Sequence, residues 1–161
     1  NAERLDLVNN YQGFRLPMDD YALQASYFNE FYKAAAWNGV SNTMYAYGRS
    51  TLTTKDANYY NSSDPYEGLS IATTPLGFYD GNTNAGFTTN PNQNLFGIYD
   101  LCGGVCELML DTYASGNIDE HIIRGGCWVV DSGSSLLRNN LKKSMCNSKS
   151  SRQPTQVLMI V

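Results

Sequence analysis

The sequence predicts an α+β domain with a small twisted antiparallel sheet, one main helix and much irregular loop. Three observations favour this class. An apolar stripe at helical spacing lies early in the chain, and two apolar segments with strand composition lie near its end. Between them the chain is rich in turn-forming and aromatic residues, with 14 Gly and 12 Tyr in 161 residues. That length fits one domain over residues 1–161 with an apolar core of its own.

The N-terminal part holds the one segment with a clear helical pattern. Before it, we expect the end of a short helix and then a short strand that Pro17 ends. Asp19 or Asp20 can cap the main helix, and Asn38-Gly39 can stop it. The stripe that would face the core recurs at helical spacing and consists of Tyr21, Ala25, Phe28, Tyr32 and Ala35.

The middle of the chain, residues 40–99, alternates short aromatic pieces with turn chemistry. Tyr47-Gly48 and Asp80-Gly81 are examples of the turn pairs. The segment is too long and too aromatic for a linker, and buried aromatic side chains can organise a domain that is mostly loop. We therefore expect ordered loops or many short strands on a scaffold.

Two strand candidates lie near the C-terminus. Residues 121–130 read as a strand interrupted at Gly125-Gly126, where a bulge or a close backbone approach is expected. Residues 156–161 are so apolar that we expect an interior strand of a sheet. The polar stretch 131–155 between them should cross the surface, where loops on a rigid scaffold carry binding sites.

Composition and charge exclude several classes. Apolar residues make up 42% of the chain, which argues against disorder, and there is no apolar run of about 18 residues that could span a membrane. No signal peptide is visible, and the chain starts at Asn, so we expect either a cytosolic protein or a removed leader.

The charge is unevenly distributed along the chain. Residues 1–123 carry five Lys or Arg and 14 Asp or Glu, whereas residues 124–161 carry six Lys or Arg and one acidic residue. These basic residues are too sparse to predict nucleic-acid binding, and a basic segment docking on an acidic scaffold is the favoured interpretation.

Four cysteines stand at Cys102, Cys106, Cys127 and Cys146. They allow three disulfide pairings, between which the sequence does not choose. A zinc site is not expected, because the close pair has CxxxC spacing and His121 is the only histidine. We expect buried free thiols, with one disulfide if the protein is exported.

Seven short motifs follow one another along the chain. They are GFRLPMDDYALQA (13–25), YAYG (45–48), ANY (57–59), TPLG (74–77), NLFGIYDL (94–101), CGGVCEL (102–108) and RGGCW (124–128). Together they resemble the signature of formylglycine-generating-enzyme-like domains, the sulfatase-modifying-factor branch of the C-type lectin fold. The resemblance covers roughly residues 10–161 and implies that fold, without the family's N-terminal portion.

The resemblance also bears on catalysis. Enzymatic members have two reactive cysteines shortly after the RGGSW motif, which bind copper and oxidise a substrate cysteine. The matching positions here fall near Val130 and Ser135, and neither residue can supply a thiolate. The chain also has no G-x-S-x-G, HExxH or P-loop motif. We therefore expect neither copper nor enzymatic activity; the alternative is a diverged sulfatase-modifying oxidase or another family enzyme.

Calcium is the cofactor that the resemblance implies. The loop that wraps Ca²⁺ in family members corresponds to the Asp100 and Glu107 side chains and the Gly103 and Val105 carbonyls, which are hard oxygen donors. A second site would use Asn58 and the Tyr59 carbonyl, with Asp64 or Glu67 as the acidic partner.

Non-enzymatic relatives include the variable proteins of diversity-generating retroelements, in which the segment after RGGSW is hypermutated on a fixed scaffold. The Ser- and Asn-rich segment after Trp128 is similar in composition, although its lysines depart from that pattern, and an ordinary polar loop is the alternative.

The expected partner is a protein or other macromolecule rather than a sugar, and we expect Trp128 to anchor the binding surface from below. A retroelement protein would be cell-surface, secreted or virion-associated, and otherwise we expect a cytoplasmic one. A third possibility is a structural fragment that another chain completes. The expected ligand-binding residues are Val129, Val130, Asp131, Ser132, Gly133, Ser134, Ser135, Asn139, Asn140, Ser144, Met145, Asn147, Ser148 and Lys149.

Overall fold

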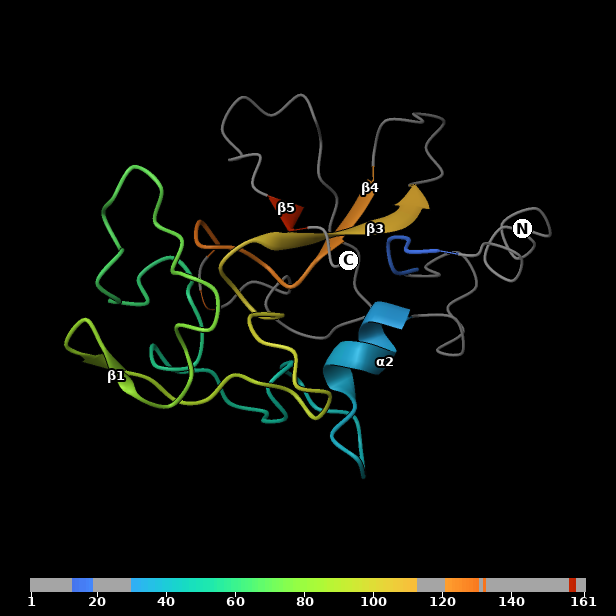
Figure 1. The fold of residues 1–161 in the computed structure, drawn as a ribbon, viewed down its shortest axis with the longest axis horizontal. Coiled ribbons are helices and arrows are strands. Elements are labelled where there is room, and N and C mark those ends of the chain that lie inside the picture. The colour runs from blue at the N-terminus through green and yellow to red at the C-terminus, as the bar shows by residue number, and fades with distance from the viewer. Residues whose placement is uncertain (1–12, 19–29, 113–120, 131, 133–156, 159–161) are drawn as a thin grey trace.

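A computed structural model describes residues 13–18, 30–112, 121–130, 132 and 157–158 (Figure 1). Its elements, in chain order, are α2 (Glu30–Ala36), β1 (Thr83–Asn84), β2 (Phe87–Thr88), β3 (Cys106–Thr112), β4 (His121–Arg124) and β5 (Val157–Leu158). The long loops between α2 and β3 make up most of the described chain. The predicted α+β class with one main helix and much loop is confirmed.

The main sheet has three strands in the order β4-β3-β5. β3 pairs with β4 in antiparallel register, with Glu107 opposite Arg124, and with β5 in parallel register, with Cys106 opposite Val157. The predicted antiparallel pairing holds between β3 and β4, and the short parallel pair of β3 with β5 makes the sheet mixed. β1 and β2 form a separate antiparallel hairpin at the far end of the loops (Figure 1).

The central strand β3 is the element that the sequence pattern concealed. Residues 102–108 read as a motif loop, and no strand was expected at 106–112. In the structure Glu107 is fully buried between Cys106 and the partly buried Leu108. A charged residue inside a buried strand breaks the apolar pattern by which such strands are recognised.

Both late strands differ from their predicted form. β4 ends at Arg124 and does not resume after the glycines, because Gly125 and Gly126 both have φ of 80° and the chain then turns, with Val130 N donating to Cys127 O at 3.0 Å. Among the described strands, β5 is an edge strand beside β3, and the interior strand of the sheet is β3. The interior position expected for residues 156–161 is therefore not observed in this sheet.

The described part of the helix begins at Glu30, and the predicted start near Asp19 or Asp20 lies outside the described residues. Its end is as predicted. Asn38 Oδ1 accepts hydrogen bonds from Val40 N at 3.0 Å and Ser41 N at 2.8 Å, and Gly39 has φ of 96°. In the described part of the helix the buried residues are Phe31, Ala35 and Ala36, whereas Tyr32 of the predicted stripe is only partly buried. The other stripe residues apart from Ala35 lie outside the described residues: Tyr21, Ala25 and Phe28.

The segment before the helix is not a strand over residues 13–17, contrary to expectation. It is nevertheless fixed to the rest of the fold. Pro17 O accepts a hydrogen bond from Leu110 N of β3 at 2.9 Å, and Arg15 forms a bidentate ion pair with Glu30 of α2, at 2.6 and 2.7 Å. This segment thus ties the helix to the central strand.

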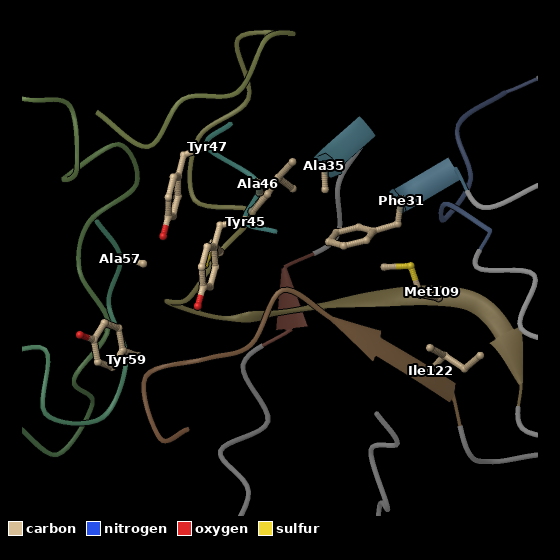
Figure 2. Close-up of a cluster of buried hydrophobic side chains, with 11 residues drawn as sticks. Phe31, Ala35, Tyr45, Ala46, Tyr47, Ala57, Tyr59, Met109 and Ile122 are labelled. Atoms are coloured by element: carbon tan, nitrogen blue, oxygen red, sulfur yellow. The ribbon is translucent and has the colours of Figure 1, made fainter. Parts of the chain in front are cut away.

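The main core joins α2, the loops and the sheet (Figure 2). Phe31 points toward Met109 of β3, while Tyr45 and Tyr47 stack with ring centroids 5.5 Å apart. The Arg49 guanidinium lies 4.5 Å from the centre of the Tyr47 ring. Aromatic side chains from loops therefore fill the space between helix and sheet, as the composition predicted.

Two buried carboxylates hold the loops together. Asp56 accepts hydrogen bonds from the side chain of Arg49, from Thr53 N and Oγ1 at 2.6 Å each, and from Asn90 Nδ2 at 2.9 Å. Asp64 accepts four more hydrogen bonds, from groups that span residues 58–79.

Among the described residues, no helix is long and apolar enough to cross a membrane.

Candidate functional site

The predicted site segments meet at one junction beside β3. Gly103 N donates to Gly125 O at 2.9 Å, and Gly104 N donates to Asn58 O at 2.8 Å. Trp128 N donates to Gly104 O at 3.0 Å. Three motifs that are far apart in the sequence, at 57–59, 102–108 and 124–128, are therefore joined backbone to backbone.

This close approach requires glycine at two positions. A Cβ atom on Gly103 would overlap the Asn58 carbonyl oxygen, and one on Gly125 would overlap the Glu107 carboxylate. Both residues also have positive φ, of 82° and 80°. Close packing and backbone conformation together explain why these two positions are glycine.

Glu107, the last residue of the predicted calcium set, has an unusual environment. It is fully buried, and in the described part of the chain neither carboxylate oxygen has a hydrogen-bond partner. Burial raises the pKa of Glu107 well above its ordinary value, and the negative charge of Asp100 raises it further. A buried carboxylate without donors, close enough to a second carboxylate to be repelled by it, fits the coordination of a hard cation.

Asp100, the first residue of the set, is held by its neighbours. It has φ of 60°, and its carboxylate accepts hydrogen bonds from Gly77 N at 2.6 Å and Asn92 Nδ2 at 2.9 Å. Among the residues that the structure describes, no three His, Cys, Asp or Glu side chains gather in a way that could hold a metal ion. A cation here would therefore depend on main-chain carbonyls, such as those of Gly103 and Val105, as well as on two carboxylates.

The second predicted calcium set is arranged differently. Asn58 Nδ2 donates to Asp64 Oδ2 at 2.7 Å and to Ala72 O at 3.0 Å, while its buried Oδ1 has no partner. Asp64 also accepts hydrogen bonds from Ser62, Tyr66 and Tyr79. The carboxylate of this set is satisfied by protein donors, which leaves only the Asn58 carbonyl oxygen in need of a partner.

The other acidic partner that the sequence offered for this set is Glu67. Its carboxylate accepts hydrogen bonds from Asn61 N and Ser63 N at 2.6 Å each. Tyr59, whose carbonyl was the second expected ligand, is buried in the main core. Neither acidic candidate therefore has the donor-free surroundings that distinguish Glu107.

A pocket of about 350 Å³ opens beside Trp128, between the turn after β4 and the loop at residues 58–72. Tyr60, Leu69 and Ala72 provide apolar walls, and Glu67 provides a carboxylate. Tyr60 is 56% exposed and Leu69 is 54% exposed. Trp128 is only partly buried, so its side chain contributes to this open surface and does not belong to the core.

Sequence reasoning found Trp128 but missed the opposite wall of the pocket, formed by Tyr60 and Leu69. The only available signal was an aromatic residue directly after the ANY motif at 57–59. Pairing with the turn explains its position, because Tyr60 N donates to Val130 O at 2.9 Å.

The predicted ligand-binding surface is described only at its beginning. Val129 and Val130 are partly buried and pack against the small apolar cluster of Cys106, Ile123 and Cys127. Ser132 is exposed. The remaining predicted residues lie outside the described residues: Asp131, Gly133, Ser134, Ser135, Asn139, Asn140, Ser144, Met145, Asn147, Ser148 and Lys149.

Three of the four cysteines are described, and all three are buried thiols as expected, whereas Cys146 lies outside the described residues. A hydrogen bond with Cys106 lowers the pKa of Cys127 to about 7, and burial opposes that effect. Burial raises the pKa of Cys102. The contact between Cys106 and Cys127 was not predicted, since nothing in their spacing indicates it.

Comparisons with known proteins agree with this architecture. Residues 19–156 match the family described as the sulfatase-modifying factor enzyme 1-like domain. A search of curated proteins gives no match. Among solved structures, the chain is similar to Treponema denticola variable protein 1, with a TM-score of 0.53 and 20% identity. That match covers 85% of this chain and 43% of the other, so this chain spans less than half of its neighbour's length.

The family match extends over most of the chain, and the structural neighbour has the C-type lectin-like fold that the sequence motifs imply. The chain belongs to the family of sulfatase-modifying factor enzyme 1-like domains.

Proposed function

We propose that this protein is a non-catalytic ligand-recognition domain, which presents a changeable polar surface on a C-type lectin-type scaffold. The observation that carries the proposal is the junction at Gly103, Gly104 and Trp128. There Trp128 is hydrogen-bonded through its backbone to Gly104, in the loop that leads into β3. Trp128 also lies in the turn at 127–130, directly before the polar segment in the sequence. A rigid support beneath an adaptable polar segment is the arrangement that antibody-like recognition uses.

The pocket beside Trp128 supports this proposal. Its aromatic and aliphatic walls adjoin Val130, at the beginning of the predicted surface. Exposed aromatic side chains in a concave site are the usual anchors of protein recognition. The likeness in fold to a protein named variable protein 1 gives further support. We propose a protein or another macromolecule as the ligand.

The test is a selection from a displayed library. Asp131, Ser134, Asn140 and Ser148 are randomised together in the full chain, and the library is selected against purified hen lysozyme. A control library of equal size randomises four exposed loop positions: Ser50, Lys55, Leu76 and Gln93. We expect lysozyme binders from the first library and none from the control. No enrichment, or equal enrichment from both libraries, would contradict the proposal.

We propose also that Ca²⁺ stiffens this scaffold at Asp100, Gly103, Val105 and Glu107. Glu107 supports the site, because its buried carboxylate has no hydrogen-bond donor among the described residues and is repelled by Asp100. The second set, around Asn58 and Tyr59, has weaker support, since protein donors already satisfy Asp64. Calcium at about 100 times its dissociation constant would stabilise the fold by about 2.7 kcal/mol.

Thermal unfolding with Ca²⁺ and with a chelator measures this effect. We expect Ca²⁺ to raise the melting temperature of the wild type and of Asp80→Asn, which changes an exposed-loop carboxylate, but not of Glu107→Gln. An unchanged wild-type melting temperature at millimolar Ca²⁺ would contradict a calcium site.

Catalysis by copper is the competing function. The two positions at which enzymatic relatives carry reactive cysteines fall near Val130 and Ser135, so we propose that the oxidase chemistry is absent. Copper(I) titration and incubation with a cysteine-containing substrate peptide test this directly. Stoichiometric copper binding together with oxidation of the peptide thiol would replace our proposal with the oxidase reading.

A further inference from the structure

Two thiols meet at the base of the turn that begins the predicted ligand surface. Cys106 is the first residue of β3, and Cys127 lies in the turn after β4. A hydrogen bond joins their side chains. Each is 7% exposed, and both belong to one small apolar cluster with Ile123. The fold therefore brings together two sulfur atoms that are far apart in the sequence.

The backbone around both residues is fixed in a way that holds this contact. Gly103 N donates to Gly125 O at 2.9 Å, and Trp128 N donates to Gly104 O at 3.0 Å. Cys106 and Cys127 each lie within three residues of one of these bonds. Two cysteines can form a disulfide only when their Cβ atoms already approach closely, and here both side chains are buried in the same three-residue cluster.

The third described cysteine lies in a different cluster. Cys102 is buried in the main core with Phe31 and Tyr45, whereas Cys106 and Cys127 belong to the second cluster. Cys146 lies outside the described residues. Among the three described cysteines, the structure thus brings Cys106 and Cys127 together and places Cys102 in a different cluster.

We propose that Cys106 and Cys127 are a redox-active pair, which a disulfide oxidant such as oxidised glutathione converts into a disulfide bond. One thiolate attacks the glutathione disulfide and releases one reduced glutathione, and the second thiol then displaces the other. Two protein thiols and one oxidised glutathione become one protein disulfide and two reduced glutathione molecules, so that the protein loses two electrons and two protons.

The bond would fasten the turn at Val129 and Val130 to the central strand β3. It closes a loop that contains the whole connection between β3 and β4, which restricts the unfolded chain more than the folded one. Oxidation should therefore raise the melting temperature by roughly 5–10 °C. This chemistry does not depend on what the surface binds.

The experiment uses the full reduced chain, equilibrated at a series of ratios of reduced to oxidised glutathione. The protein is then denatured, its remaining thiols are alkylated, and its peptides are identified by mass spectrometry. We expect a peptide pair linked through Cys106 and Cys127, with a protein mass lower by two hydrogen atoms, and with Cys102 and Cys146 alkylated. The melting temperature should rise over the same range of ratios.

Three variants serve as controls. Cys106→Ser and Cys127→Ser should each abolish the rise in melting temperature, whereas Cys146→Ser should retain it. The mass measurement on the wild type does not depend on how well any variant folds. Alkylation of both Cys106 and Cys127 even in pure oxidised glutathione, a stable mixed disulfide with glutathione, or a link from either residue to another cysteine would overturn the proposal.

Discussion

Buried carboxylates organise this protein at the scale of single residues, and they have different partners. Four protein hydrogen-bond donors face Asp56, and four face Asp64. Glu107 faces none. Because a buried charge is costly unless it is paired, the first two are structural, and the third is the one that requires an external cation or a proton.

Asp56 provides a direct test of this distinction. Burial raises its pKa, but hydrogen bonds from Thr53, Asn90 and Arg49 outweigh burial and hold the pKa below its ordinary value of 3.8. Asp56→Asn removes the charge that those donors face and should lower the free energy of unfolding by about 2–4 kcal/mol at pH 7. Urea denaturation measures the loss.

The pH dependence of that loss has a defined sign. Since the pKa of Asp56 is lower in the folded than in the unfolded state, its contribution is complete above about pH 4 and disappears as the pH falls through the folded value. The difference between wild type and Asp56→Asn should therefore shrink in acid. The control Asp80→Asn changes a carboxylate that is only partly buried and should cost less than Asp56→Asn at pH 7; equal losses for the two variants would contradict the structural role of Asp56.

The family motifs predicted the residues of the calcium set, but not the surroundings of their side chains. They identified Asp100 and Glu107 as partners in one site, and the charge of Asp100 contributes to the raised pKa of Glu107. The sequence could not indicate that Gly77 and Asn92 hold Asp100, because those contacts depend on how the loops pack. For the same reason the contact between Cys106 and Cys127 was not foreseeable.

At the scale of elements, the glycines in the loop before β3 determine whether the junction can form. Gly103 and Gly104 both have positive φ, of 82° and 70°. A side chain at Gly103 would collide with the backbone of Asn58, whereas nothing lies within 4 Å of a Cβ at Gly104. The two neighbours thus separate the effect of backbone conformation from the effect of close approach.

Alanine at each position makes this comparison. Gly104→Ala should cost about 1–2 kcal/mol, from the left-handed conformation alone. Gly103→Ala bears the same conformational cost and must also displace the Asn58 backbone, so its loss should exceed that of Gly104→Ala by at least about 2 kcal/mol. Chemical denaturation of both variants measures the difference. Equal losses would mean that the chain does not pass as close to Asn58 as described.

Elements with a regular apolar pattern were predictable, and those without one were not. The helix end at Asn38-Gly39 and the strand before Gly125 followed from local signals. β3 did not, because buried Glu107 interrupts its apolar run. The parallel pairing of β3 with β5 depends on long-range topology, which no local signal specifies.

At the scale of the whole molecule, loops and not regular elements fill most of the space beside the sheet (Figure 1). The core is built from aromatic side chains of those loops packed on α2 and β3 (Figure 2). The buried residues of the described main cluster lie between Phe31 and Ile122, and among the described residues after Trp128 only Val129 and Val130 pack against a cluster. Such a scaffold can leave the polar segment that starts at Asp131 free to change. We infer that the scaffold and the changeable surface are separate parts of the molecule.

The melting temperature of one variant tests that claim most directly. Asp131, Ser134, Asn140 and Ser148 are replaced together by alanine, and the variant is compared with the wild type and with Gly103→Ala. If the segment is a surface, the melting temperature should stay within about 3 °C of the wild type, far above that of Gly103→Ala. A fall as large as that of Gly103→Ala would mean that the segment is part of the core, and would contradict the account.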